Sequence, residues 1–81
     1  MYGERHHLTH EFPELQHTIH LLKDQGGDFA DLLKEYETTD KTIHVLEKQM
    51  QPTTDAHMLD LKVKRLTLKD QLYNQLRQYQ A

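Results

Sequence analysis

The chain has 81 residues, of which 36% are hydrophobic and 7% aromatic, and its formal charge is −3. This length predicts a single helical domain over residues 1–81 with a thin core, so helix packing or a partner chain must supply part of the stability. Cysteine is absent, which excludes disulfides and thiolate chemistry. No apolar run approaches the roughly 20 residues of a membrane span, and the first residues lack an apolar signal core, so we expect a cytoplasmic protein.

The first predicted element is a short N-terminal helix near residues 10–23. Its apolar residues recur at spacings of three and four, and they are Leu8, Phe12, Leu15, Ile19 and Leu22. Pro13 suits the first turn of a helix, because proline lacks the N–H that the first turn leaves unpaired. Gly26 and Gly27 then predict a break, since adjacent glycines disfavour a helix interior.

A second helix is predicted near residues 28–50, with Asp28 as its N-cap. Its apolar residues alternate in spacing between three and four, as in a coiled coil, and they are Phe29, Leu32, Tyr36, Ile43, Leu46 and Met50. Thr39 occupies the one position of this series where an apolar residue is missing. Pro52 predicts that the helix ends before it.

A third helix is predicted near residues 55–79, with Asp55 as its N-cap. It carries two apolar stripes, the first made of Met58, Leu61, Leu68, Leu72, Leu76 and Tyr79, and the second of Leu59, Val63, Leu66 and Tyr73. Together they cover on the order of 220° of the helix surface, so the helix should touch two neighbours. The second neighbour is either the N-terminal helix or a helix of another chain. The thin core favours some self-association, although the sequence leaves both alternatives open.

The short connection around Pro52 predicts an all-α fold, an antiparallel and coiled-coil-like helical hairpin with a short N-terminal helix. In this register Asp40 faces Arg65 and Glu37 faces Lys69. Asp40 and Arg65 therefore form the predicted structural pair, which places an acid beside a cation inside an apolar stripe. Residues 1–50 carry a charge of −5 and residues 51–81 a charge of +2, so the two arms attract each other.

Seven histidines raise the question of a metal site. His6 and His10, and His17 and His20, have spacings that place each pair on one helix face, with Glu14 nearby. That face is opposite the apolar stripe, and a structural zinc site needs about four ligands, so we interpret these histidines as solvated. We predict no metal and no cofactor. Serine is also absent, and no phosphate loop or nucleophile with a base is present, so we expect no catalysis.

Four cations lie within the eight residues 62–69, in the order Lys62, Lys64, Arg65 and Lys69. Such a run attracts phosphate backbones, but apolar residues alternate with the charges and the whole chain is acidic. We therefore predict a non-catalytic protein–protein interaction or scaffold module, with an unknown protein partner and no membrane; a homo-oligomer is one of the alternatives that the sequence leaves open. Its candidate interaction surface comprises Lys62, Lys64, Lys69, Leu59, Leu66 and Tyr73. The alternative is a nucleic-acid- or ribosome-associated regulator that uses the basic run, although nucleic acid is the less favoured partner.

The order of several motifs resembles the YdcH-like family of small bacterial proteins, a domain of unknown function. The motifs are Glu11-Phe12-Pro13-Glu14, Phe29-x-x-Leu32, Asp40-x-x-Ile43-His44 and Lys64-Arg65-Leu66-x-Leu68-Lys69-Asp70. The resemblance runs from about residue 6 to residue 76. It implies a helical hairpin with no assigned enzymatic activity. It also implies that the signature positions in this chain are Asp40, Ile43, His44, Arg65, Leu68, Lys69 and Asp70.

Overall fold

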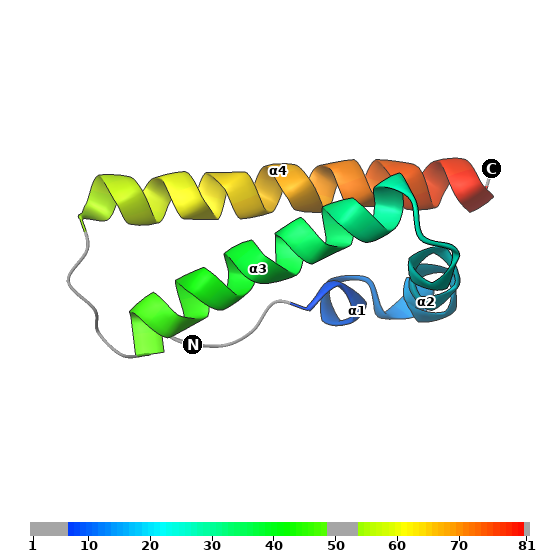
Figure 1. The fold of residues 1–81 in the computed structure, drawn as a ribbon, viewed down its shortest axis with the longest axis horizontal. Coiled ribbons are helices and arrows are strands. Elements are labelled where there is room, and N and C mark those ends of the chain that lie inside the picture. The colour runs from blue at the N-terminus through cyan, green and yellow to red at the C-terminus, as the bar shows by residue number, and fades with distance from the viewer. Residues whose placement is uncertain (1–6, 49–53, 81) are drawn as a thin grey trace.

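The computed structural model of the chain describes residues 7–48 and 54–80. Its two long helices, α3 (Asp28–Lys48) and α4 (Asp55–Gln80), run in opposite directions and are inclined to each other (Figure 1). These described ranges contain no strand, so the predicted all-α hairpin is confirmed. The predicted turn at Pro52 and the seam residue Met50 lie outside the described residues.

The buried side of α3 differs in part from the predicted series. Its buried residues are Phe29, Leu33, Tyr36, Thr39, Asp40 and Ile43, whereas Leu32 and Leu46 are only partly buried. A spacing of four and three therefore runs through Phe29, Leu33, Tyr36, Asp40 and Ile43. The predicted Leu32 packs against the hydrophobic cluster at its edge, beside Gln71 and Gln75 of α4. The prediction missed Leu33, which borders Leu8 and Ile19 of the N-terminal elements.

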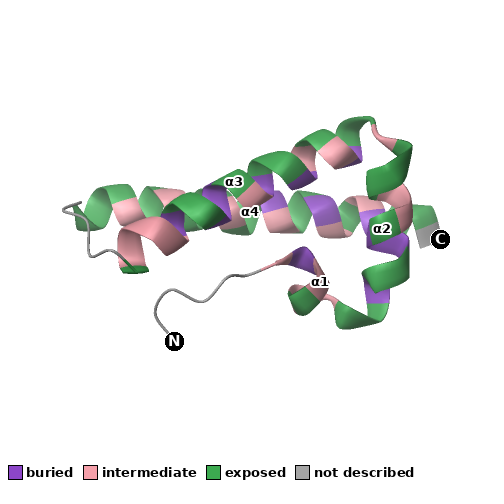
Figure 2. Cartoon of the chain, turned by 60° about the horizontal axis from the view of Figure 1, so that its bottom comes forward, coloured by how far each residue is buried: buried purple, intermediate pink, exposed green. Residues whose placement is uncertain are grey.

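The matching face of α4 consists of Leu68, Leu72 and Leu76, which are 6%, 0% and 0% exposed. They form one hydrophobic cluster with residues of α3 and with Leu8, Leu15 and Ile19 from the N-terminal region. Burial of these side chains is the main favourable contribution to folding in so short a chain. Figure 2 shows the buried residues on the surfaces where the helices meet.

The N-terminal region is not the single helix that its periodicity predicts. It forms α1 (Leu8–Glu11), a short 3-10 helix η1 (Pro13–Leu15) and α2 (Gln16–Gln25). The break falls at Phe12, whose φ of −132° and ψ of 69° are not helical. A residue before proline is disfavoured in the α region, so Pro13 causes the break and also begins η1. α2 lies at the end of the hairpin where α3 begins, and α1 lies along the side of the hairpin, nearer its middle (Figure 1).

Both long helices begin one residue earlier than the capping pattern predicts. The N–H of His57 donates to the Oγ1 of Thr54 at 3.1 Å, so Thr54 is the N-cap of α4 and Asp55 is its first helical residue. In α3, Asp28 is likewise the first helical residue, and the N–H of Asp31 donates to the carbonyl of Gly27 at 3.1 Å. The prediction that Asp28 and Asp55 are N-caps was therefore wrong. Both carboxylates still lie in a first turn, where the helix dipole favours an acid.

Gly26→Ala should lower the free energy of unfolding by about 1–3 kcal/mol. Gly26 ends α2 with φ 77° and ψ −155°, a conformation that residues with a Cβ rarely adopt. A Cβ at Gly26 would meet no atom within 4 Å, so the cost is backbone strain and not a clash. Urea denaturation measures the change, with Gln25→Ala as the control at about 0.5 kcal/mol or less. Equal losses in the two variants would contradict this assignment.

Candidate functional site

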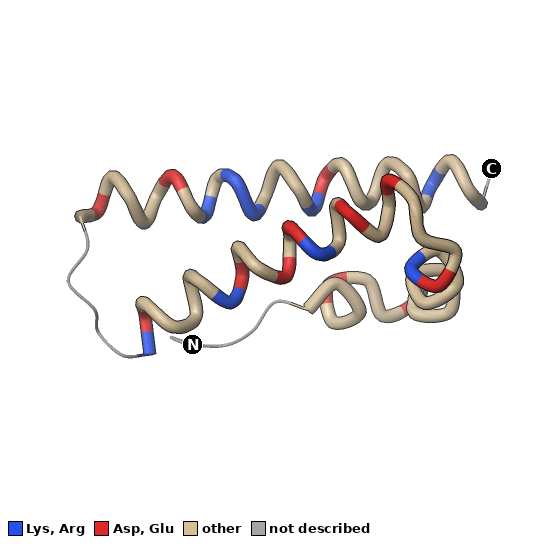
Figure 3. The backbone as a smooth tube through the Cα atoms, viewed as in Figure 1, with Lys and Arg blue, Asp and Glu red and all other residues tan. Residues whose placement is uncertain are grey.

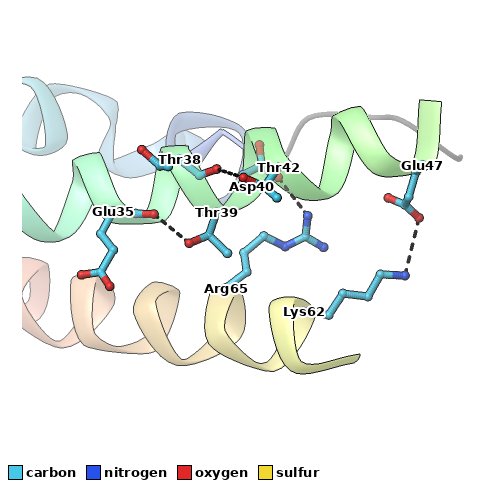
Figure 4. Close-up of polar contacts among 8 residues, drawn as sticks. All are labelled: Glu35, Thr38, Thr39, Asp40, Thr42, Glu47, Lys62 and Arg65. Atoms are coloured by element: carbon cyan, nitrogen blue, oxygen red, sulfur yellow. Dashed lines mark hydrogen bonds and ion pairs between the residues drawn. The ribbon is translucent and has the colours of Figure 1, made fainter. Parts of the chain in front are cut away.

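A buried polar contact joins the two long helices of the hairpin. The Nη1 of Arg65 donates to the Oδ1 of Asp40 at 2.9 Å (Figure 4). The side chain of Asp40 is 1% exposed and that of Arg65 is 17% exposed. A charged hydrogen bond of this kind offsets the cost of removing both groups from water, and it favours the register in which the two residues are opposite.

Thr39 lies beside this pair and is also buried. Its Oγ1 donates to the carbonyl of Glu35 at 2.9 Å, within the same helix (Figure 4). The hydroxyl is therefore satisfied, and a polar residue is tolerated in the core without a partner on α4. Thr39 and Asp40 therefore make one turn of the buried side of α3 polar, and this turn lies opposite Arg65.

Two further ion pairs follow the same interface, one partly buried at Glu47 and one exposed. The Nζ of Lys62 lies 3.5 Å from Glu47, and the Nζ of Lys64 lies 3.4 Å from Glu35. Together with Arg65, three of the four cations in the run 62–69 face carboxylates of α3. Figure 3 shows the cations of α4 beside the acidic residues of α3. The positive charge of this run is therefore largely compensated within the chain.

Lys69 is placed differently from the predicted register. Within the described ranges it makes no ion pair with Glu37, so that part of the prediction was wrong. Glu37 instead lines a small cavity with residues of α1 and α2, among them Leu8 and Lys23. Because the two helices are inclined to each other, some residues that would face each other between parallel axes are too far apart to form an ion pair.

A cavity of about 300 Å³ lies between α1 and the hairpin. It is lined by Glu11, Tyr36, Lys62, Arg65, Leu66 and Lys69. The lining contains the carboxylate of Glu11 as well as three cations, and one of these cations, Arg65, already donates to Asp40. The cavity therefore lacks the uniform charge that would attract a phosphate.

The second stripe of α4 is divided into two parts. Tyr73 is half-buried, and its ring stacks on Phe12 with the centroids 4.9 Å apart. Leu59, Val63 and Leu66 are 61%, 53% and 53% exposed. The N-terminal segment of the same chain thus covers the Tyr73 end of the stripe and leaves the other end to solvent. Tyr79, which was predicted in the first stripe, is also 48% exposed.

The histidines do not converge. His10, His17 and His20 are exposed, and His6 lies outside the described residues. No group of three or more histidine, aspartate or glutamate residues in the described part of the chain could hold a metal ion. His44 is half-buried on α3, and its Nδ1 has no hydrogen-bond partner among the described residues. Within the same ranges, no helix combines the length and the apolar character that crossing a membrane requires.

Comparison with known proteins identifies the hairpin. The family model described as "Protein of unknown function (DUF465)" matches residues 29–76. These residues include most of α3, most of α4 and both partners of the Asp40–Arg65 contact, whereas α1, η1 and α2 precede them. Searches of curated proteins and of solved structures gave no match. The match covers more than half of the chain, which therefore belongs to the DUF465 family of unknown function, as do the YdcH-like proteins that its motifs resemble.

Proposed function

We propose that the chain is a non-catalytic protein–protein interaction or scaffold module. It binds another polypeptide through the α4 stripe, by which we mean Leu59, Val63 and Leu66. The observation that supports this proposal is the exposure of all three side chains, each more than half accessible to solvent. Single exposed apolar residues are common, but three in a row on one helix face form a continuous apolar patch.

The position of the α4 stripe suits a helical partner. Its residues are spaced by four and three, so they lie on one side of α4, away from the side that carries Leu68 and Leu72. This spacing is that of a helix-to-helix seam. At Tyr73 the same side of α4 already accepts an aromatic side chain from another segment. A second helix can cover the remaining part in the same way.

A polypeptide is a better partner for this surface than a nucleic acid. Phosphate binding depends on cations that exchange small counterions for phosphate groups. Lys62, Lys64 and Arg65 lie within 3.5 Å of carboxylates on α3, so binding phosphate would require breaking these pairs. The α4 stripe has no such competition, because its side chains face solvent.

A photo-cross-linking residue in place of Val63 tests the proposal. With p-benzoylphenylalanine at position 63, irradiation of cells that produce the chain should give an adduct with a protein. The matched control carries the same residue in place of Gln71, which is also exposed on α4 but lies outside the α4 stripe. We expect an adduct at position 63 that is absent at position 71. Equal labelling at both positions, or none at position 63, would refute the interaction surface.

A further inference from the structure

We infer that the polypeptide covering the α4 stripe is a second copy of this chain, bound with its α4 antiparallel. This inference rests on the proposed function and names the partner. The series Ala56, Leu59, Val63 and Leu66 has spacings of three, four and three, and all four residues are exposed. Such a series forms the apolar seam of a two-helix contact. Ala56, Leu59 and Val63 lie on the side of α4 away from Leu68 and Leu72, and Leu66 also borders the cavity that Glu11 and Tyr36 line. In the pair, the two α3 helices then lie on the outer sides of the two α4 helices.

The apolar residues of the seam fix the register. In the antiparallel arrangement, Leu59 meets Val63 of the second copy, and Ala56 meets Leu66 of the second copy. Each layer then joins two apolar side chains, and the two-fold axis passes near residue 61. A shift by one heptad would place Leu59 against Asp70 of the second copy and bury a carboxylate without a cation.

The charges beside the seam favour the antiparallel direction. Asp55 and Lys69 lie on the same edge of the seam, and neither makes an ion pair within the described ranges. In the antiparallel register Asp55 comes beside Lys69 of the second copy, and the two-fold axis generates this contact twice. In a parallel pair Asp55 would instead lie beside Asp60 of the second copy, which is repulsive. Lys62 comes near its own equivalent at the axis, but Glu47 lies 3.5 Å from it and compensates its charge.

Cysteine cross-linking tests this register. The chain has no cysteine of its own, so any disulfide must join the introduced residues. Leu59→Cys and Val63→Cys are mixed, and the mixture is oxidised under conditions in which circular dichroism shows both variants to be helical. We expect a disulfide dimer in the mixture and little in either variant alone, since only the mixed pair comes within disulfide distance. Gln71→Cys mixed with Val63→Cys is the control and should stay monomeric.

The results separate the alternatives. Dimers that form in each single variant as readily as in the mixture would show parallel pairing and overturn the register. No dimer in any sample would overturn the second copy as partner. In that case an adduct between position 63 and a different protein would still support the proposed function.

A mixing experiment tests the charge contacts independently. Asp55→Lys alone places a second cation against Lys69 of the second copy, and Lys69→Asp alone places two acids together. Each variant should therefore self-associate about tenfold more weakly than the unchanged chain, as measured by sedimentation equilibrium. An equal mixture of the two should recover the original association, because both contacts are then between opposite charges. A mixture that associates no better than its components would contradict the proposed pairing.

Discussion

Leu72→Ala should lower the free energy of unfolding by about 2–5 kcal/mol. Leu72 is 0% exposed and lies in the cluster that joins α3, α4 and the N-terminal elements. Removing three carbons there loses buried apolar surface and leaves a cavity that two long helices cannot close without shifting. In an 81-residue chain this loss is a large part of the total stability.

Urea denaturation at low protein concentration measures this effect without a contribution from self-association. The matched control is Leu59→Ala, the same substitution on the same helix at a residue that is 61% exposed. We expect the control to change the free energy of unfolding by about 0.5 kcal/mol or less. Similar losses in both variants would mean that Leu59 is covered within the single chain, contrary to the structure.

Arg65→Met should lower the free energy of unfolding by about 3 kcal/mol. It removes the hydrogen-bonded cation from the carboxylate of Asp40, which is only 1% exposed. Lys64→Met is the control, because Lys64 and Glu35 are each about half exposed and their pair should contribute about 1 kcal/mol or less. Thermal or urea denaturation of the two variants gives the comparison.

A double-mutant cycle isolates the contact between the two residues. Adding Asp40→Leu to Arg65→Met should recover part of the stability that the single substitution loses, because the buried carboxylate is then gone. The coupling free energy should be about 0.5–3 kcal/mol. If the losses of the two single variants simply add, Asp40 and Arg65 do not interact in solution.

The hairpin could be predicted because its signals are local. Helical spacing defines two long segments, and Pro52 separates them. A connection this short makes the two segments antiparallel neighbours. The register around Pro52 then places Asp40 opposite Arg65, and the structure shows these two side chains 2.9 Å apart.

Other features depend on small shifts that periodicity does not resolve. Leu32 and Leu33 are adjacent and both apolar, so the spacing alone could not decide which one enters the core. Leu33 is the more buried of the two because it borders Leu8 and Ile19 of the N-terminal elements, whereas Leu32 borders polar residues of α4 at the edge of the core. The break at Phe12 has a signal in Pro13, because proline disfavours the α region at the residue before it as well as favouring a helix start.

The neighbour of the second α4 stripe could not be chosen from the sequence, because it depends on how far the N-terminal elements reach. Phe12 reaches Tyr73, and the break before Pro13 turns the chain into α2, beside the start of α3. The N-terminal elements thus cover one part of the stripe and leave Leu59, Val63 and Leu66 exposed. The interaction surface that we propose is therefore smaller and more apolar than the predicted set of Lys62, Lys64, Lys69, Leu59, Leu66 and Tyr73.

Methyl NMR with a soluble paramagnetic probe tests the central claim most directly. In a dilute sample the probe should broaden the methyl signals of Leu59, Val63 and Leu66 and leave those of Leu72 and Leu76 sharp. In a concentrated sample the first three signals should become protected, because a second copy covers them. If the methyl groups of the α4 stripe are as shielded as Leu72 in the dilute sample, or stay fully exposed in the concentrated one, the account of this surface is wrong.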